Sequence, residues 1–136
     1  MHKPNAATRE PVPPETNRVA REAVDSAFKV HSTLGPGLIE SVYEACLVHE
    51  LHGRGLQTQR QVARPVLYGN LRLDAGLRLD MVVEDRVVVE LKAVEGVLPV
   101  HKAQLLTYLK LSGYRVGLLI NFNTLLIKDG IHRIVL

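Results

Sequence analysis

The segment RLDMVVEDRVVVELK, residues 78–92, constrains the fold more than any other part of the chain. On both sides of its central EDR triplet, valine, leucine and methionine are interspersed with charged residues, a pattern typical of two β-strands joined by a tight turn. Only a few registers are open to such a pair, because a shift of one residue moves every side chain to the opposite face. The register therefore decides where the charged side chains lie.

A three-residue loop at residues 84–86 separates the apolar side chains from the charged ones. It predicts three apolar pairs on one face: Val83 with Val87, Met81 with Val89, and Leu79 with Leu91. The opposite face then carries Val82 beside Val88, Asp80 beside Glu90, and Arg78 beside Lys92. A two-residue turn at Asp85-Arg86 would instead place Asp80 opposite Leu91 and bring a charge into the apolar face, so we favour the first register.

The favoured register places two carboxylates, those of Asp80 and Glu90, directly opposite each other. This pairing is unfavourable without a countercharge. Hydrated Mg²⁺ is a natural one, because it takes hard oxygen ligands and usually only one or two protein carboxylates. Lys92 points to the same side. The alternative is that Arg78 and Lys92 neutralise the pair on a solvated face, but the two valines expected there indicate a face that is partly covered.

The remaining sequence predicts an α/β sandwich, with a mixed sheet flanked by helices, in the order α-α-β-β-β-α-β-β. Besides the hairpin, the expected elements are helices over 17 to about 34, 38–52 and about 100–111, and strands over 56–68, 115–122 and the C-terminal end. A short, poorly defined stretch is expected after the Gly69-Asn70 turn. Pro65 suggests an edge strand or a bulge. Asp129-Gly130 predicts a hairpin turn between two β-rich runs. The expected buried side chains of the second helix include Ile39, Val42, Cys46 and Leu51.

Composition limits the class of protein. With 136 residues, 46% hydrophobic and 23% charged, the chain is expected to form one globular domain over residues 17–136. Four of the seven prolines lie within residues 1–16, which are therefore expected to be a disordered tail. The net charge of +3 is compatible with a polyanionic partner. A single cysteine, Cys46, excludes an internal disulfide and favours the cytoplasm. No apolar run predicts a membrane span.

Other kinds of site find little support. Cys46, His49 and His52 have helical spacings that could hold zinc, but one cysteine without a second cluster argues against it. The chain has no phosphate-binding P-loop, no G-x-S-x-G and no G-x-G-x-x-G.

Three motifs resemble a known group of proteins. Asp80, nine intervening residues and ELK (90–92) resemble the D-x(n)-(D/E)-x-K signature of the PD-(D/E)XK nuclease superfamily. GLIESVY (37–43) matches the G-x-x-E-x-x-Y motif for which the GxxExxY protein family is named. QLLTY (104–108) resembles a Q-x-x-x-Y motif that follows the catalytic lysine in several branches. The resemblance covers residues 17–136 and implies a restriction-endonuclease-like sandwich. One departure is Leu79, which stands where the signature has proline, a residue that the superfamily often lacks.

The resemblance also implies roles for individual residues. Asp80 and Glu90 would bind a divalent metal, Mg²⁺ or Mn²⁺, with help from the backbone carbonyl of Leu91. Lys92 would position or activate the attacking water, or stabilise charge on the phosphate. A lysine beside two carboxylates keeps its proton, which favours the electrostatic role. Glu40 would complete the metal site; the alternative is a solvated glutamate favoured by the helix dipole.

Four further residues are expected near the site. The resemblance places Gln104 and Tyr108 close to the metal or substrate. His101, at the start of the same helix, could contact phosphate or could be a plain surface histidine. Tyr43 is expected to be a packing residue whose hydroxyl finds a partner.

The leading hypothesis is an Mg²⁺- or Mn²⁺-dependent nuclease that hydrolyses nucleic-acid phosphodiester bonds, with DNA favoured over RNA as substrate. The intact set of Asp80, Glu90 and Lys92 favours this enzyme. A non-catalytic nucleic-acid-binding or protein-interaction module on the same fold is the alternative, favoured by the lack of a strongly basic patch. A purely structural domain would require these charges to be exposed and far apart. The oligomeric state stays open, with a homodimer among the alternatives.

Overall fold

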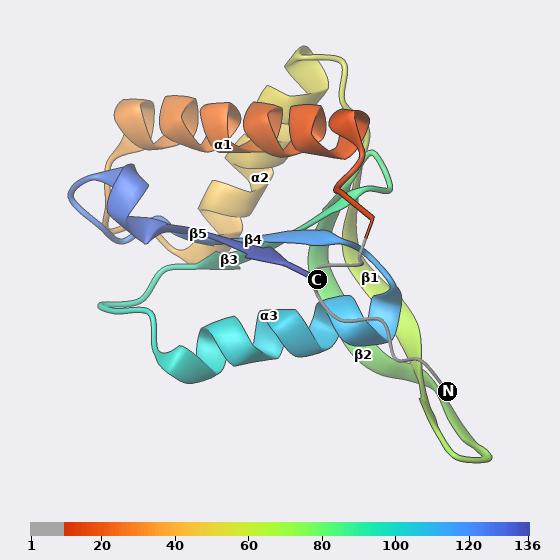
Figure 1. Ribbon diagram of the computed structural model, residues 1–136. Helices are drawn as coiled ribbons and strands as arrows, with labels where there is room; N and C mark the ends of the chain where they lie inside the picture. The colour runs from red at the N-terminus through yellow and green to blue at the C-terminus, as the bar shows by residue number, and fades with distance from the viewer. Residues whose placement is uncertain (1–9) are drawn as a thin grey trace.

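A five-stranded sheet lies between two helical layers in the computed structural model, which describes residues 10–136 (Figure 1). The helices are α1 (Pro14–Leu34), α2 (Glu40–Gly53) and α3 (Pro99–Ser112), with a short 3₁₀ helix η2 (Ile127–Gly130). The strands are β1 (Thr58–Tyr68), β2 (Leu71–Val83), β3 (Val87–Lys92), β4 (Val116–Asn121) and β5 (Ile131–Val135). Within residues 10–136, every helix is too short or too polar to cross a membrane.

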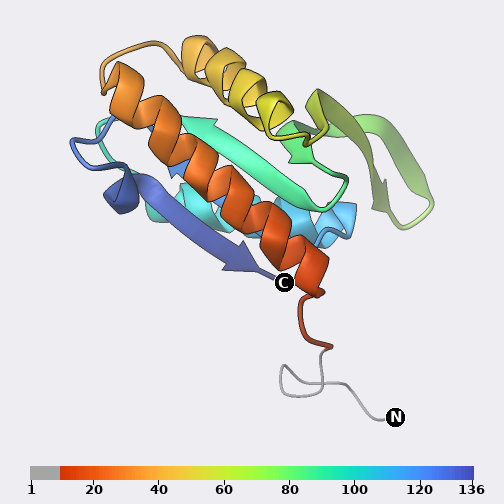
Figure 2. The ribbon, with the colours of Figure 1, turned by 90° about the horizontal axis from the view of Figure 1, so that it is seen from above.

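The strands lie side by side in sequence order, β1-β2-β3-β4-β5. Only β3 and β4 are parallel, because α3 carries the chain back across the sheet between them; every other neighbouring pair is antiparallel. Seen from above, α1 and α2 cover one face and α3 lies beneath the other (Figure 2). The predicted α/β sandwich with a mixed sheet, in the order α-α-β-β-β-α-β-β, is therefore confirmed.

Each face of the sheet has its own hydrophobic core. Val87, Val89 and Leu91 belong to the core beneath α1 and α2, whereas Val88 belongs to the core against α3. Because side chains alternate along a strand, Glu90 and Lys92 project from β3 on the same side as Val88. The charged residues of β3 therefore face α3.

The predicted hairpin register is confirmed at its turn. Three pairs form, Val83 with Val87, Val82 with Val88, and Met81 with Val89, around the loop 84–86. The ladder ends there, so the predicted pairs of Asp80 with Glu90, of Leu79 with Leu91 and of Arg78 with Lys92 are wrong as strand pairs. Leu79 lies instead in the core against α3. The reason is a bend in β2, which leaves β3 at Asp80 and continues alongside β1 alone.

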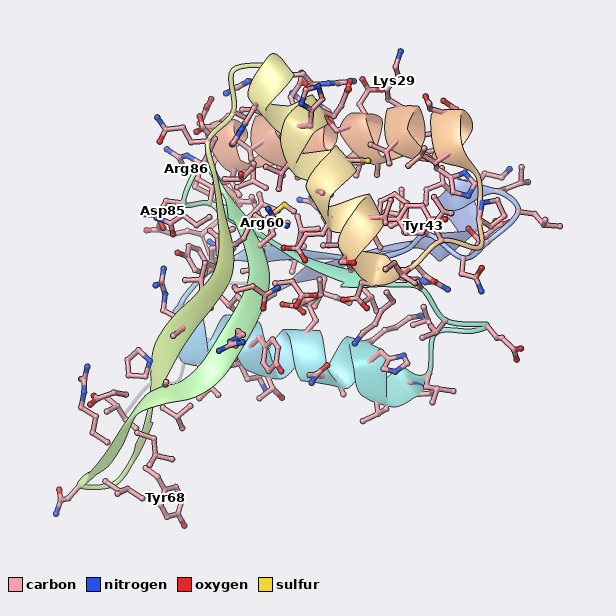
Figure 3. The ribbon with its side chains drawn as sticks, turned by 180° about the vertical axis from the view of Figure 1, so that it is seen from behind. Lys29, Tyr43, Arg60, Tyr68, Asp85 and Arg86 are labelled. Atoms are coloured by element: carbon pink, nitrogen blue, oxygen red, sulfur yellow. The ribbon has the colours of Figure 1, made fainter. Side chains whose placement is uncertain are left out.

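Beyond this bend, β1 and β2 form a long hairpin that projects from the body of the protein (Figure 1). The register shifts between Arg64 and Val66, which confirms the predicted irregularity at Pro65, and β1 is an edge strand. The stretch after the Gly69-Asn70 turn was expected to be poorly defined, but it is the first part of a continuous β2. The exposed side chain of Tyr68 marks the tip (Figure 3).

Both N-terminal helices differ from prediction. α1 begins at Pro14, inside the predicted tail of residues 1–16, because proline is well tolerated in the first turn of a helix; residues 1–9 lie outside the described part. On α2, Ile39 and Val42 are exposed rather than buried, and Cys46 is half-buried. The helix starts at Glu40, and its buried face carries Tyr43, Glu44, Leu47 and Leu51.

The segment between β4 and β5 also differs from prediction. Residues 123–126 form a loop rather than a strand, and Asp129-Gly130 ends the 3₁₀ helix η2 instead of making a tight hairpin turn. Gly130 lies so close to β4 that a Cβ atom there would collide with the backbone carbonyl oxygen of Asn121. This contact brings the end of η2 against the last residue of β4.

We expect Gly130→Ala to destabilise the protein by about 1–3 kcal/mol, because the added methyl group must displace backbone rather than a flexible side chain. Urea unfolding measures the change. Gly96→Ala is the matched control, since a Cβ at Gly96 meets nothing within 4 Å. Equal stabilities for the two variants would contradict the close approach.

Candidate metal centre

The carboxyl groups of Asp80 and Glu90 meet where the β2–β3 ladder ends. Glu90 Oε1 accepts a hydrogen bond of 3.1 Å from the backbone N–H of Asp80. Asp80 Oδ2 accepts one of 3.0 Å from the backbone N–H of Leu91. Each carboxyl group is thus bonded to the backbone of the opposite strand. These side-chain bonds replace the backbone pairs of a regular ladder.

Glu90 is almost fully buried, with 6% of its surface exposed. Burial, then the charge of Asp80, then a hydrogen bond between the two carboxyl groups raise the pKa of Glu90 from 4.5 to about 9. Lys92 opposes this shift but does not cancel it. Burial and the neighbouring carboxylate therefore favour the protonated form of Glu90.

Lys92 ends β3 at a point fixed by β4. Its carbonyl oxygen accepts a hydrogen bond from Phe122 N–H at 3.0 Å. Asn121, which is buried, accepts from Val94 N–H through Oδ1 at 3.1 Å and donates to Val94 O through Nδ2 at 2.9 Å. These bonds hold the chain on both sides of Ala93, and with it the backbone from which the Lys92 side chain projects.

The start of α2 brings Glu40 toward the pair. Burial and the charge of Asp80 raise the pKa of Glu40, whereas Lys92 lowers it, so this carboxylate lies within electrostatic range of both. Tyr43 is fully buried beneath this turn and stacks on Phe122, with ring centroids 4.6 Å apart. Its hydroxyl donates to Gly35 O at 2.6 Å and accepts from Leu38 N–H at 3.1 Å.

The Tyr43 hydroxyl thus ties down both ends of the GPGL turn (35–38) that leads into Glu40. In the GLIESVY segment, Gly37 lies within this turn and Glu40 follows it. Tyr43 fixes the turn, and the turn positions Glu40. Figure 3 shows Tyr43 beside this end of α2.

The residues of α3 face the pair from the other side. Gln104 Nε2 donates to the Tyr108 hydroxyl at 2.9 Å. Burial and the charges of Glu90 and Asp80 raise the pKa of Tyr108, which places its ring near both carboxyl groups. The two residues of the predicted Q-x-x-x-Y motif therefore act as a bonded unit beside the site.

His101 lines a pocket of about 550 Å³ together with Lys92, Gln104 and three other residues of α3. Its Nδ1 accepts a hydrogen bond from Leu98 N–H at 3.0 Å, which caps the start of the helix. In the neutral ring, the proton must then be on Nε2, which is free to donate. The backbone carbonyl of Leu91 points to the same edge of β3 as its N–H, toward Asp80, because the two groups of a strand residue share one side.

The motifs of the sequence did not single out Glu44, Arg60, Gln61 or Asn121. Glu44 is buried on α2 and accepts from Arg60 Nε at 2.9 Å. Gln61 follows Arg60 in β1, between the pairs of Arg60 with Met81 and of Val62 with Leu79. One feature of the sequence could have pointed to Asn121: it is the lone amide side chain in the apolar run GLLINF. No sequence pattern could have pointed to the Glu44–Arg60 ion pair, because it forms only when α2 and β1 pack together.

The donor set fits a divalent cation of the hard type. Asp80 and Glu90 offer carboxylate oxygens that repel each other when both are ionised, and a cation would relieve this repulsion. Within residues 10–136, however, no three His, Cys, Asp or Glu side chains come close enough to hold a metal as a group. The described arrangement therefore supplies two carboxylates, with Glu40 nearby.

The chain matches the family model of the PD-(D/E)XK nuclease superfamily over residues 17–134. Among solved structures, the crystal structure of SSO0001 is similar, with 22% sequence identity and a TM-score of 0.49. The similarity covers 88% of this chain and 60% of that chain, so the present chain spans less than two thirds of its length. No curated protein matches.

We expect the metal-free protein to lose stability as the pH rises from about 5 to 9. The pKa of Glu90 is raised in the folded state, so stability is fully present below the unfolded pKa of 4.5 and is lost as the pH rises through the folded value of about 9. Glu90→Gln, which has no proton to lose, should show a smaller loss. Urea unfolding across this range measures both; parallel losses would contradict the buried proton.

Proposed function

Because the chain belongs to the PD-(D/E)XK nuclease superfamily, we propose that it is a nuclease that hydrolyses phosphodiester bonds of nucleic acid with Mg²⁺ or Mn²⁺. One observation carries the proposal: two carboxyl groups, one of them buried, meet beside a lysine at the end of a strand. Two carboxyl groups held this close, one of them buried, repel each other when ionised, and a bound cation would offset that repulsion.

Nucleases of this superfamily generally use divalent metals. Asp80, Glu90 and the carbonyl of Leu91 would hold the ion, with Glu40 completing the site from α2. When bound, such an ion lowers the pKa of a coordinated water and offsets the charge of the scissile phosphate.

The chain's own residues supply the rest of the reaction. The Lys92 ammonium group would stabilise negative charge that grows on the phosphate in the transition state. His101 would donate from Nε2 to a phosphate oxygen, since its Nδ1 is occupied by the helix cap. Gln104 and Tyr108 would hold the substrate or the bound water beside the two carboxyl groups. These four residues line one side of the site, along β3 and α3.

We propose DNA as the substrate in preference to RNA. The net charge of +3 suits a polyanion without supplying a strong basic surface. The single cysteine, Cys46, suits a reducing compartment such as the cytoplasm. Cleavage assays with single-stranded, duplex and branched DNAs and RNAs, each with and without Mg²⁺ or Mn²⁺, define the substrate. Glu90→Ala is the inactive control.

Lys92→Met should lower turnover by about a hundred- to a thousandfold while leaving nucleic-acid affinity nearly unchanged, because the ammonium group acts mainly in the transition state. Single-turnover cleavage and a direct binding titration measure the two effects separately. Lys29→Met, at an exposed position on α1, is the matched control. A proportional loss of binding and activity, or a wild-type protein that binds but never cleaves, would favour a non-catalytic binding module.

Glu40→Gln should weaken Mg²⁺ or Mn²⁺ binding by about ten- to a hundredfold, because it removes one charge from the metal site. Isothermal calorimetry measures the affinity. Glu50→Gln, near the opposite end of α2, is the control for a general effect on the helix. Unchanged affinity in Glu40→Gln would make this residue a solvated glutamate at the start of a helix.

A further inference from the structure

Besides the register shift at Pro65, the β1–β2 ladder lacks a pair at the position of Asp80. Arg60 pairs with Met81 and Val62 pairs with Leu79, but the intervening pair of Gln61 with Asp80 is absent. Gln61 has a φ angle of 51°, in the left-handed region that glycine adopts freely and other residues rarely do. A non-glycine residue in this conformation persists only where its surroundings hold it there.

The surroundings of Gln61 are provided by α2. The buried carboxylate of Glu44 accepts from Arg60 Nε at 2.9 Å and lies 3.5 Å from Gln61 Nε2. Two successive residues of β1 are thus anchored to one side chain of the helix. Glu44 lies one turn after Glu40, so the anchor and the proposed metal ligand belong to the same helix. Arg60 points from β1 toward α2 in Figure 3.

The missing pair leaves the Asp80 amide available to the metal site. In the antiparallel ladder, neighbouring pairs alternate between bonded and non-bonded, and a regular extended residue at position 61 would restore a pair with Asp80. That pair would direct the Asp80 N–H toward β1. In the structure, this N–H donates instead to Glu90 Oε1, and the Asp80 carboxylate accepts from Leu91 N–H. The irregular backbone at Gln61 therefore occurs together with the hydrogen bonds that hold the Asp80 and Glu90 carboxyl groups at the end of the ladder.

We propose that Gln61 is a positioning residue for the metal centre: its left-handed backbone, anchored with Arg60 to Glu44, keeps Asp80 unpaired with β1 and directed at Glu90. Gln61 touches neither substrate nor metal. It acts by setting the place where β2 leaves β3. The metal-affinity part of this inference rests on the proposed function, whereas the backbone part concerns the metal-free protein.

The test compares glycine and valine at position 61. We expect glycine to be tolerated better than valine there, which is the opposite of their order at a regular strand position. Gln61→Gly should keep metal affinity within about threefold of wild type, because glycine tolerates positive φ. Gln61→Val should lower it by about tenfold or more, because a β-branched residue strongly disfavours that region. Gln59→Gly and Gln59→Val are the controls at an exposed, regularly paired residue of β1, where valine suits the strand and glycine does not. Calorimetry with Mn²⁺ and Mg²⁺ gives the affinities.

Amide hydrogen exchange of the metal-free proteins gives a second readout. The Leu91 N–H, which donates to Asp80, should exchange at least about tenfold faster in Gln61→Val than in Gln61→Gly, while the amides of Val88 and Leu118 in the sheet stay matched. Equal Leu91 exchange in the two variants, or a uniform acceleration of all three amides, would overturn the positioning role. A wild-type protein that binds no metal would overturn the proposed function, and the exchange result would still decide the role of Gln61.

Discussion

The buried carboxyl group of Glu90 is the constraint on which the architecture of this site depends. A lone ionised carboxylate at this depth would cost several kilocalories per mole, so the surroundings must supply hydrogen-bond donors, a proton or a cation. The protein supplies the Asp80 amide as donor, and burial favours the protonated form of the Glu90 carboxyl group. For the Asp80 amide to donate to the Glu90 side chain, β2 must leave β3 at this point. The bend in β2 and the projecting ribbon beyond it meet this requirement.

Three separate segments converge on the pair, and each is fixed by a bond that does not itself reach the site. The Tyr43 hydroxyl closes the loop before Glu40, Asn121 pins the chain after Lys92, and the His101 ring caps its own helix. Such preorganisation matters for charge stabilisation, because dipoles already in place need no reorganisation during the reaction. The candidate metal centre thus depends on polar contacts beneath it as much as on its own carboxyl groups.

The alternation of apolar and charged residues predicted the strand pairs correctly where both faces of the sheet are covered. Val82, Val83 and Met81 found their expected partners because both faces of the hairpin are covered near its turn, which leaves one favourable register. The same reasoning failed for Leu79, since alternation carries no information about a bend set by the backbone of another strand. It also failed for Ile39 and Val42, because the start of α2 is set by the Tyr43 hydroxyl rather than by apolar spacing. For the candidate site, the motifs indicated the residues that face each other, whereas the Glu44–Arg60 ion pair depends on tertiary contact.

The outer edge of β1 has a property that follows from its irregularities. An edge strand normally presents a regular row of backbone donors and acceptors to which a stray strand can add, and this is a common route to aggregation. In β1 that row is interrupted twice: Pro65 has no N–H to offer, and the turned backbone of Gln61 breaks the repeat four residues earlier. No run of regular backbone long enough to template a partner remains between them. These two interruptions make the outer edge of the ribbon a poorer template for a further strand than a regular edge would be.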